Sequence, residues 1–197
     1  MRHLIVYAHP NPDSLNRHLL DTVTSLLVQQ GHEVVVRDLN QQNFNPVLSL
    51  EDIAGLYRGV VGADIQAEQN HVAWAGCITF IYPIWWTGMP AIMKGYIDRV
   101  FSYGFAYRYD EGIQKGLLQD KEAVIINTQG KSHAAYAASG MDKALVLTSD
   151  QGIFAYCGFR IREHFFFENA DRAGAEQVQQ WTGDIAQHYA IHHLQTN

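Results

Sequence analysis

Residues 78–94 read ITFIYPIWWTGMPAIMK. The run begins with apolar residues, many of them β-branched or aromatic, which is typical of a central parallel strand covered on both faces. Pro90 suits the first turn of a following helix, where the missing N–H is tolerated. A loop at Pro83 to Met89 separates the two. The run therefore predicts a strand, a loop and a helix of an α/β protein.

The loop carries two adjacent indoles, Trp85 and Trp86, beside Gly88. It follows the carboxyl end of the expected strand, which is where α/β proteins bind ligands. Two indoles there form a flat apolar surface that suits a planar ring system. The alternative is that both tryptophans are ordinary core residues, because large aromatic side chains are mostly buried.

The first third of the chain predicts a strand, helix, strand unit. His3 to Ala8 and Glu33 to Asp38 are short β-branched runs, and leucines and a valine recur at helical spacing in Arg17 to Gln30. Leu39 to Asp64 is expected to be irregular with one weak helical piece, and Ile65 to Ala75 to be helical.

The second half continues the alternation. Phe101 to Asp120 is rich in glycine and tyrosine, so we expect a long surface excursion without regular elements, and excursions of that length are usually functional. The later elements are expected as a strand at Lys121 to Asn127, a helix within Met141 to Phe154, a strand within Phe159 to Phe167, and an amphipathic helix at Ala170 to His193 whose apolar face extends to Leu194.

Five strands alternating with helices predict a doubly wound parallel sheet, and the 197 residues suggest one domain, 1–197. In the flavodoxin-like strand order 2-1-3-4-5, the ligand crevice lies at the switch between the first and third strands. The loops that follow these strands are His9 to Asn16 and Pro83 to Met89.

The first of these loops suits a phosphate. It precedes a helix whose unpaired N–H groups and positive dipole end attract anions, and His9, Ser14 and Asn16 add side-chain donors. GxGxxG and GxxxxGK[ST] are both missing from the chain, which argues against a Rossmann nicotinamide site and a nucleotide triphosphatase. The alternative is that Ser14 and Asn16 are helix caps only.

Composition narrows the class of partner. The chain is 47% hydrophobic and 17% charged, with a net charge of −6 and no Lys/Arg run, which argues against nucleic acid and anionic membranes. No apolar run spans a membrane and Met1 to Ala8 lacks a secretory leader, so we expect a cytoplasmic protein without membrane insertion. Cys77 and Cys157 lack metal-ligand spacing and are expected to be buried free thiols. No metal site is predicted.

Several motifs together resemble the NAD(P)H:quinone oxidoreductase family, in its DT-diaphorase-like form and its short bacterial type. They are YAHPNPDSLN at 7–16, FNP at 44–46, AEQ at 67–69, PIWWTGMPAIMKGYIDRVF at 83–101 and FAYRY at 105–109. The resemblance runs in register from Met1 to about Phe159. It implies a flavodoxin-like homodimer that binds FAD, or FMN as the alternative, with NAD(P)H as co-substrate.

The resemblance also implies roles for individual residues. Those expected to contact the flavin phosphates are His9, Ser14, Leu15, Asn16 and Gln69. Those expected to line the ring are Pro83, Ile84, Trp85 and Trp86. The polar edge of the ring is expected at Asn127, Thr128, Gln129 and Gly130. Tyr136 is expected near that edge, and Tyr107 and Tyr109 are expected to close the substrate pocket, usually from the partner subunit.

Two positions depart from the family. Gln129 replaces a glycine, so the backbone approach to the ring can differ there. Near Met141 and Asp142, where the animal enzymes carry a histidine, this chain has none in register, although His133 lies nearby in the sequence. The identity of any proton relay is therefore open.

The expected activity is ping-pong, two-electron reduction of quinones or similar flat acceptors. Three other interpretations are weighed against it. The first is a one-electron carrier, but the Phe101 to Asp120 excursion would then have no function. The second is a protein that has lost its cofactor, and the presence of both the His9 loop and the Trp86 loop argues against it. The third is a flavin-binding regulatory subunit of a potassium efflux transporter, a role that some short relatives have.

Overall fold

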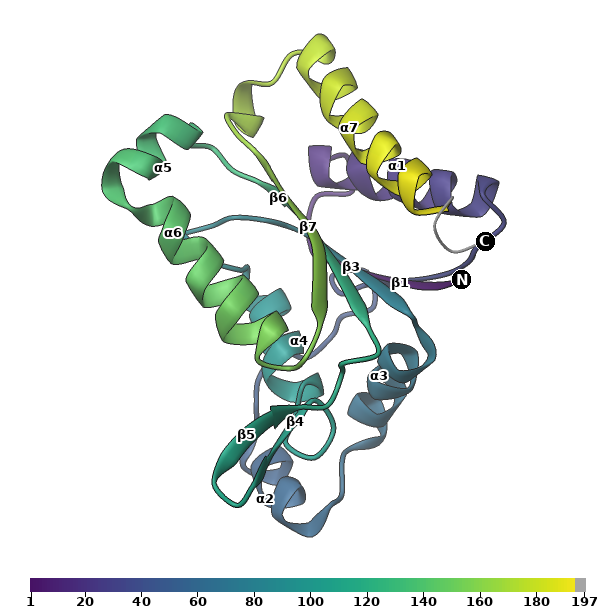
Figure 1. The fold of residues 1–197 in the computed structure, drawn as a ribbon, viewed down its shortest axis with the longest axis vertical. Coiled ribbons are helices and arrows are strands. Elements are labelled where there is room, and N and C mark those ends of the chain that lie inside the picture. Colours follow the sequence, from purple (N-terminus) through teal and green to yellow (C-terminus); the bar gives the residue numbers. More distant parts are fainter. Residues whose placement is uncertain (194–197) are drawn as a thin grey trace.

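The computed structural model describes residues 1–193 (Figure 1). Its main sheet is fully parallel, in the order β2 (Glu33–Asp38), β1 (Arg2–Tyr7), β3 (Cys77–Pro83), β6 (Glu122–Thr128), β7 (Arg160–Phe167). This confirms the predicted flavodoxin-like, doubly wound sheet with its strands in the order 2-1-3-4-5. Leu194, the last expected position of the final helix face, lies outside the described residues.

Helices cover both faces of the sheet, as Figure 1 shows. One face packs against α1 (Leu15–Gln29) and α7 (Ala175–His193). The other packs against α3 (Ala63–Trp74), α4 (Ala91–Val100) and the π-helix η1 (Leu147–Ala155), which continues α6 (Met141–Val146). Strand β3 is buried throughout because it lies in the middle of this sandwich, which explains its mostly apolar sequence; its threonine, Thr79, hydrogen-bonds the Tyr189 hydroxyl.

The first loop and the tryptophan loop both lead into helices. Ser14 is the N-cap of α1, and its hydroxyl accepts a hydrogen bond from the Arg17 N–H. Pro90 lies one residue before α4 rather than inside its first turn. The weak helical piece expected before residue 64 is α2 (Leu50–Arg58), which a capping box between Ser49 and Asp52 begins.

The expectation that Phe101 to Asp120 lacks regular elements is wrong. The segment contains an antiparallel hairpin of β4 (Tyr107–Asp110) and β5 (Ile113–Gly116). Glu111 and Gly112 join the strands with φ of 53° and 81°, the two positive angles of a type I′ hairpin turn. The turn chemistry thus allows a hairpin that the glycine and tyrosine content alone did not suggest.

The region after β6 also differs in detail from the expectation. An unpredicted short helix, α5 (His133–Ser139), begins at the Ser132 cap and ends at Gly140, whose φ is 76°. The single helix expected within Met141 to Phe154 is α6 followed by η1, and a 3₁₀ turn, η2 (Ala170–Arg172), precedes α7. In Figure 1, α5 lies near the carboxyl ends of β6 and β7, while α6 and η1 run back along one face of the sheet.

The described residues, 1–193, include both cysteines and can be searched for metal-ligating groups and membrane-spanning helices. Cys77 and Cys157 are buried and free, as predicted, and burial raises the pKa of their thiols to about 12 and about 11. Within this range the structure contains no group of three or more His, Cys, Asp or Glu side chains arranged to hold a metal ion. No helix in the same range is long and apolar enough to cross a bilayer.

Candidate active site

The loops after β1, β3 and β6 meet around a cavity of about 540 Å³, which we call the ring cavity. It is lined by His9, Leu15, Asn16, Pro83, Ile84, Trp85, Trp86, Thr128, Gln129, Gly130, Ala170 and Asp171. Most of the residues expected to bind the cofactor therefore lie in one place, although the sequence separates them widely. They meet because the carboxyl ends of parallel strands share one edge of the sheet.

Asn16 ties the first loop to the end of β6. Its side chain is buried, and its Nδ2 donates to Thr128 Oγ1 at 3.0 Å. At His9, Nδ1 lies 3.1 Å from the Asn11 N and 3.2 Å from the Asn11 O, so the loop backbone holds the ring in place. The amino end of α1 and His9 together offer donors to an anion. The Ser14 hydroxyl serves as the helix cap, which is the alternative stated above for that residue.

The tryptophan loop is a tight turn that presents an indole to solvent. Trp85 and Gly88 exchange two backbone hydrogen bonds, at 3.0 and 3.1 Å, and the residues between them have φ of 51° and 56°. These residues, Trp86 and Thr87, form a type I′ turn without its usual asparagine and glycine. Trp86 is 99% exposed, so the idea that both tryptophans are core residues is wrong.

Two further cavities extend the ring cavity. The one of about 870 Å³, the α5 cavity, shares Gln129 with it, and the one of about 330 Å³, the η1 cavity, shares Ile84. Leu145 and His164 line both of these extensions. The three cavities therefore lie next to one another along the carboxyl ends of β3, β6 and β7, and we call them together the crevice.

The wall of the α5 cavity holds polar atoms without partners. Gln129 Oε1 and Asp142 Oδ1 are buried and have no hydrogen-bond partner among the described residues. The Gln129 side chain is fixed, because its Nε2 donates to Lys131 O at 3.0 Å. A buried acceptor left unpaired is unfavourable by itself, so these atoms favour a ligand with N–H or O–H donors. Tyr136 lines the same cavity.

Four of the predicted residues do not line the crevice: Ser14, which caps α1, and Gln69, Tyr107 and Tyr109. Gln69 is buried on α3, where its Nε2 donates to Val100 O and Ser102 Oγ, each at 3.0 Å. Tyr107 and Tyr109 lie on the hairpin, apart from α5 in Figure 1, and the Tyr109 hydroxyl lies 2.9 Å from that of Tyr156. Within one chain, the structure therefore does not bring the hairpin tyrosines to Tyr136.

A polar cluster in the η1 cavity was missed by sequence reasoning. Asn127, which was predicted, lies there with His164, and Asp150 of η1 completes the cluster. The segment containing His164 was interpreted only as a strand. A single histidine among the phenylalanines of FRIREHFFF was the available signal, because it places a titratable group at a strand position next to the expected crevice.

The comparisons with known proteins agree with this geometry. The sequence profile of a family described as having a flavodoxin-like fold matches residues 1–189. The chain belongs to this family. A relative from Haemophilus influenzae, an uncharacterized NAD(P)H oxidoreductase, is 40% identical over 85% of this chain and 83% of its own length. Rat NAD(P)H dehydrogenase [quinone] 1 is 36% identical over 82% of this chain and 66% of its own.

Solved structures share the fold of this chain. A putative quinone reductase from Klebsiella pneumoniae superposes with a TM-score of 0.89 at 31% identity, covering 96% of this chain and 84% of its own. The general stress protein 14 of Treponema denticola, solved in complex with FMN, shares the fold with a TM-score of 0.66 at 21% identity, covering 97% and 99%. The predicted resemblance to the NAD(P)H:quinone oxidoreductases is confirmed.

Proposed function

We propose that the protein is a flavin-dependent NAD(P)H:quinone oxidoreductase. The observation that carries the proposal is the crevice itself, which combines an anion-binding helix end, a flat indole surface and a buried unpaired acceptor. A flavin has a phosphate, a planar ring and a polar ring edge in the same order. The names of the relatives and the confirmed family support the same activity.

The residues present fit a flavin. His9 and the amino end of α1 would hold its phosphate, the segment from Pro83 to Trp86 would lie along the ring, and Gln129 Oε1 would accept a ring N–H. When bound, the flavin supplies the ring that takes a hydride from NAD(P)H and passes it to the acceptor. We propose FAD, which the family resemblance implies. FMN is the alternative, because a phosphate site at α1 serves either cofactor.

The residues of the chain would act by binding and orienting NAD(P)H and the quinone. The crevice beside Trp86 favours flat molecules through stacking, so NAD(P)H and a quinone would occupy the same space in turn, which is a ping-pong sequence. Tyr136, which lines the α5 cavity, is the residue of this chain that we propose to hydrogen-bond the acceptor oxygen. Asp142 stands where the family histidine is missing, so no proton is assigned to that position.

The proposal includes a homodimer in the cytoplasm. Tyr107 and Tyr109 do not reach the crevice of their own chain, so they would close that of the partner, as the family resemblance implies. Tyr109 is half exposed and Ile113 is 66% exposed, so the hairpin has apolar surface available for such a contact. Sedimentation of the protein with and without FAD would test the dimer.

The activity is tested by titrating the purified protein with FAD and FMN, followed by steady-state reduction of a 1,4-naphthoquinone with NADH or NADPH. We expect Trp86→Ala to lower kcat/KM for the quinone by about fivefold, because stacking on an aromatic side chain contributes about 1 kcal/mol. Leu50→Ala is the matched control, since Leu50 is 85% exposed on α2 and lies outside the crevice. Equal effects of the two substitutions would refute the role of the indole.

A further inference from the structure

The polar cluster of the η1 cavity is a continuous chain of hydrogen bonds. His164 Nδ1 lies 2.8 Å from Asp150 Oδ1, and His164 Nε2 lies 2.7 Å from Asn127 Oδ1. Asn127 Nδ2 donates to Tyr82 O at 3.0 Å, and Ser149 Oγ donates to Asp150 Oδ1 at 2.5 Å. The chain links the π-helix η1 to three neighbouring strands, β7, β6 and β3.

The partners determine where the protons are. The Asn127 amide has its nitrogen toward the Tyr82 carbonyl, so its oxygen faces His164 and Nε2 must donate. Asp150 Oδ1 accepts from the Ser149 hydroxyl and lies 2.8 Å from His164 Nδ1. An acceptor oxygen thus lies at each ring nitrogen of His164, an arrangement that suits an imidazolium beside the Asp150 carboxylate.

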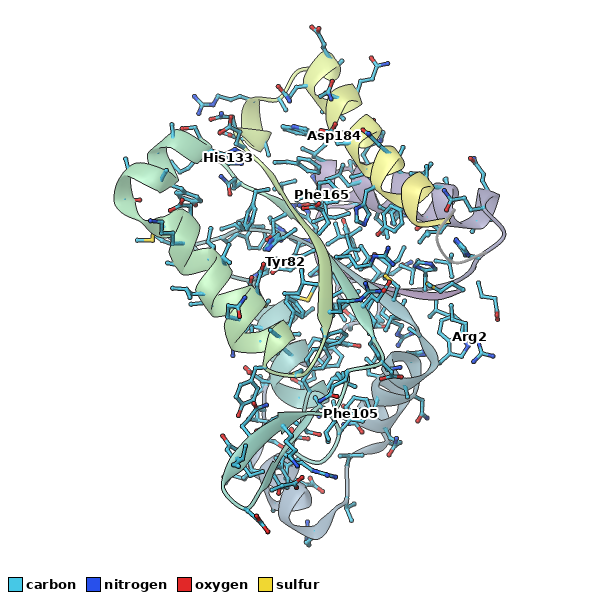
Figure 2. The ribbon with its side chains drawn as sticks, viewed as in Figure 1. Arg2, Tyr82, Phe105, His133, Phe165 and Asp184 are labelled. Atoms are coloured by element: carbon cyan, nitrogen blue, oxygen red, sulfur yellow. The ribbon has the colours of Figure 1, made fainter. Side chains whose placement is uncertain are left out.

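This ion pair is placed in unusual surroundings. The side chains of His164 and Asp150 are only 7% and 10% exposed, and the His164 ring stacks on Phe166 with centroids 3.8 Å apart. The Tyr82 side chain on the same face of the sheet belongs to the apolar core, and Figure 2 shows it between the sheet and the helices. Burying an ion pair in such a layer contributes little to stability, which suggests another role.

The cluster lies where the parts of the crevice join. His164 lines both the α5 and the η1 cavities, and Asn127 directly precedes Thr128 and Gln129, which line the ring cavity. Asp150 is brought to this point by η1, and π-helical segments occur frequently at functional sites. His164 therefore holds the oxygen of the Asn127 amide at the carboxyl end of β6, while Tyr82 O holds its nitrogen.

We propose that His164 is a positioning residue of the crevice. Held as an imidazolium by Asp150, it fixes the Asn127 amide and the carboxyl end of β6, and so orients the Gln129 wall toward the bound ring. The inference rests on the proposed flavin-dependent function for its effect on the cofactor. The protonation of His164 itself does not depend on that function.

The first test uses the flavin-free protein labelled with ¹⁵N-histidine. Long-range ¹H–¹⁵N spectra at neutral pH are expected to show that both ring nitrogens of His164 are protonated, and Asp150→Asn is expected to remove one of these protons. The His164 signals are assigned by their loss in His164→Gln. A wild-type spectrum with one unprotonated His164 nitrogen would overturn the imidazolium.

The second test measures FMN binding and the midpoint potential of the bound flavin. His164→Gln leaves the buried Asp150 carboxylate without its cation, so we expect reduced flavin to bind about tenfold less tightly relative to oxidised flavin, which lowers the potential by about 30 mV. The double variant His164→Gln/Asp150→Asn removes the unpaired charge and is expected to return to within about threefold of the wild type. His71→Gln, on α3, is the control.

The outcomes separate the inference from the proposed function. Wild-type potential and FMN affinity in His164→Gln would overturn the positioning role, as would a double variant more impaired than the single one. If His164→Gln fails to fold, Asp150→Asn provides the comparison. Its ring is expected to be neutral, so the net charge of the pair is unchanged and the potential should stay close to that of the wild type, as in the double variant, whereas a shift as large as about 30 mV would overturn the charged pairing. Absence of FMN and FAD binding by the wild-type protein would overturn the proposed function and the role of His164 in it, while the flavin-free spectra still test the imidazolium.

Discussion

The type I′ turn at Trp86 and Thr87 stores strain that a double substitution should release. Both residues have positive φ, and Thr87 is β-branched, which makes this conformation especially unfavourable. Left-handed geometry costs about 1–2 kcal/mol for a residue other than glycine. Trp86→Asn/Thr87→Gly places in the turn the two residue types that favour it.

The magnitude follows from the exposure of the turn. Because Trp86 is 99% exposed, its replacement removes almost no buried apolar surface. Relief of strain at two residues gives about 2–4 kcal/mol, of which the flexibility of glycine in the unfolded chain and the residual strain of asparagine cancel about half. We therefore expect the free energy of unfolding to rise by about 1–2 kcal/mol, and Tm to rise by a few degrees.

Urea and thermal unfolding of the flavin-free protein measure this change. Thr87→Ala is the matched control, because alanine keeps a Cβ at positive φ and should give no comparable gain. The double variant should also bind flat quinones less well, since it lacks the indole. A double variant no more stable than the wild type would refute the idea that the turn is strained in order to present Trp86.

Three further substitutions test the packing around the site and the opposite end of the sheet. Asn16→Leu leaves the Thr128 hydroxyl unpaired and should lower stability by about 1–3 kcal/mol and weaken FMN binding, while adding Thr128→Val should recover much of the stability in urea unfolding. Gly95→Ala places a Cβ 2.2 Å from Pro46 O and should cost about 1–3 kcal/mol, whereas Gly183→Ala meets no atom within 4 Å and should not destabilise. Burial, more than the nearby charge of His32, lowers the pKa of His3 from 6.5 to about 3, so the neutral ring is favoured in the folded state. The neutral His3 ring contributes its full stability above pH 6.5, and this stability is lost as the pH falls toward 3, at up to about 1.4 kcal/mol per pH unit. In urea unfolding, the wild type should therefore lose about 2 kcal/mol more than His3→Gln between pH 7 and pH 5.

The fold could be predicted because its signals are local and repeated. Strand β3 is mostly apolar because both of its faces are covered, and the periodicity of α1 reflects one buried face. The hairpin at 107–116 was missed because its strands are short and its turn depends on the backbone angles of Glu111 and Gly112. Composition does not report such angles.

The site could be predicted in part for a related reason. Loops after the first and third strands must meet in a doubly wound sheet, so the residues of the ring cavity follow from topology once the strands are known. The Asp150 and His164 pair could not be predicted, because the direction of Asp150 depends on the π-helix. The exposure of Trp86 likewise depends on a strained turn that residue type argues against.

The central claim is that nicotinamide nucleotide reduces a flavin bound in the crevice and that a quinone reoxidises it. The most direct measurement is the visible spectrum of the flavin-reconstituted protein, followed anaerobically after rapid mixing with NADPH or NADH. The account predicts fast bleaching that an added quinone reverses. Slow bleaching with both nucleotides would contradict it and favour an electron-carrier or regulatory role, and failure to bind flavin would refute it.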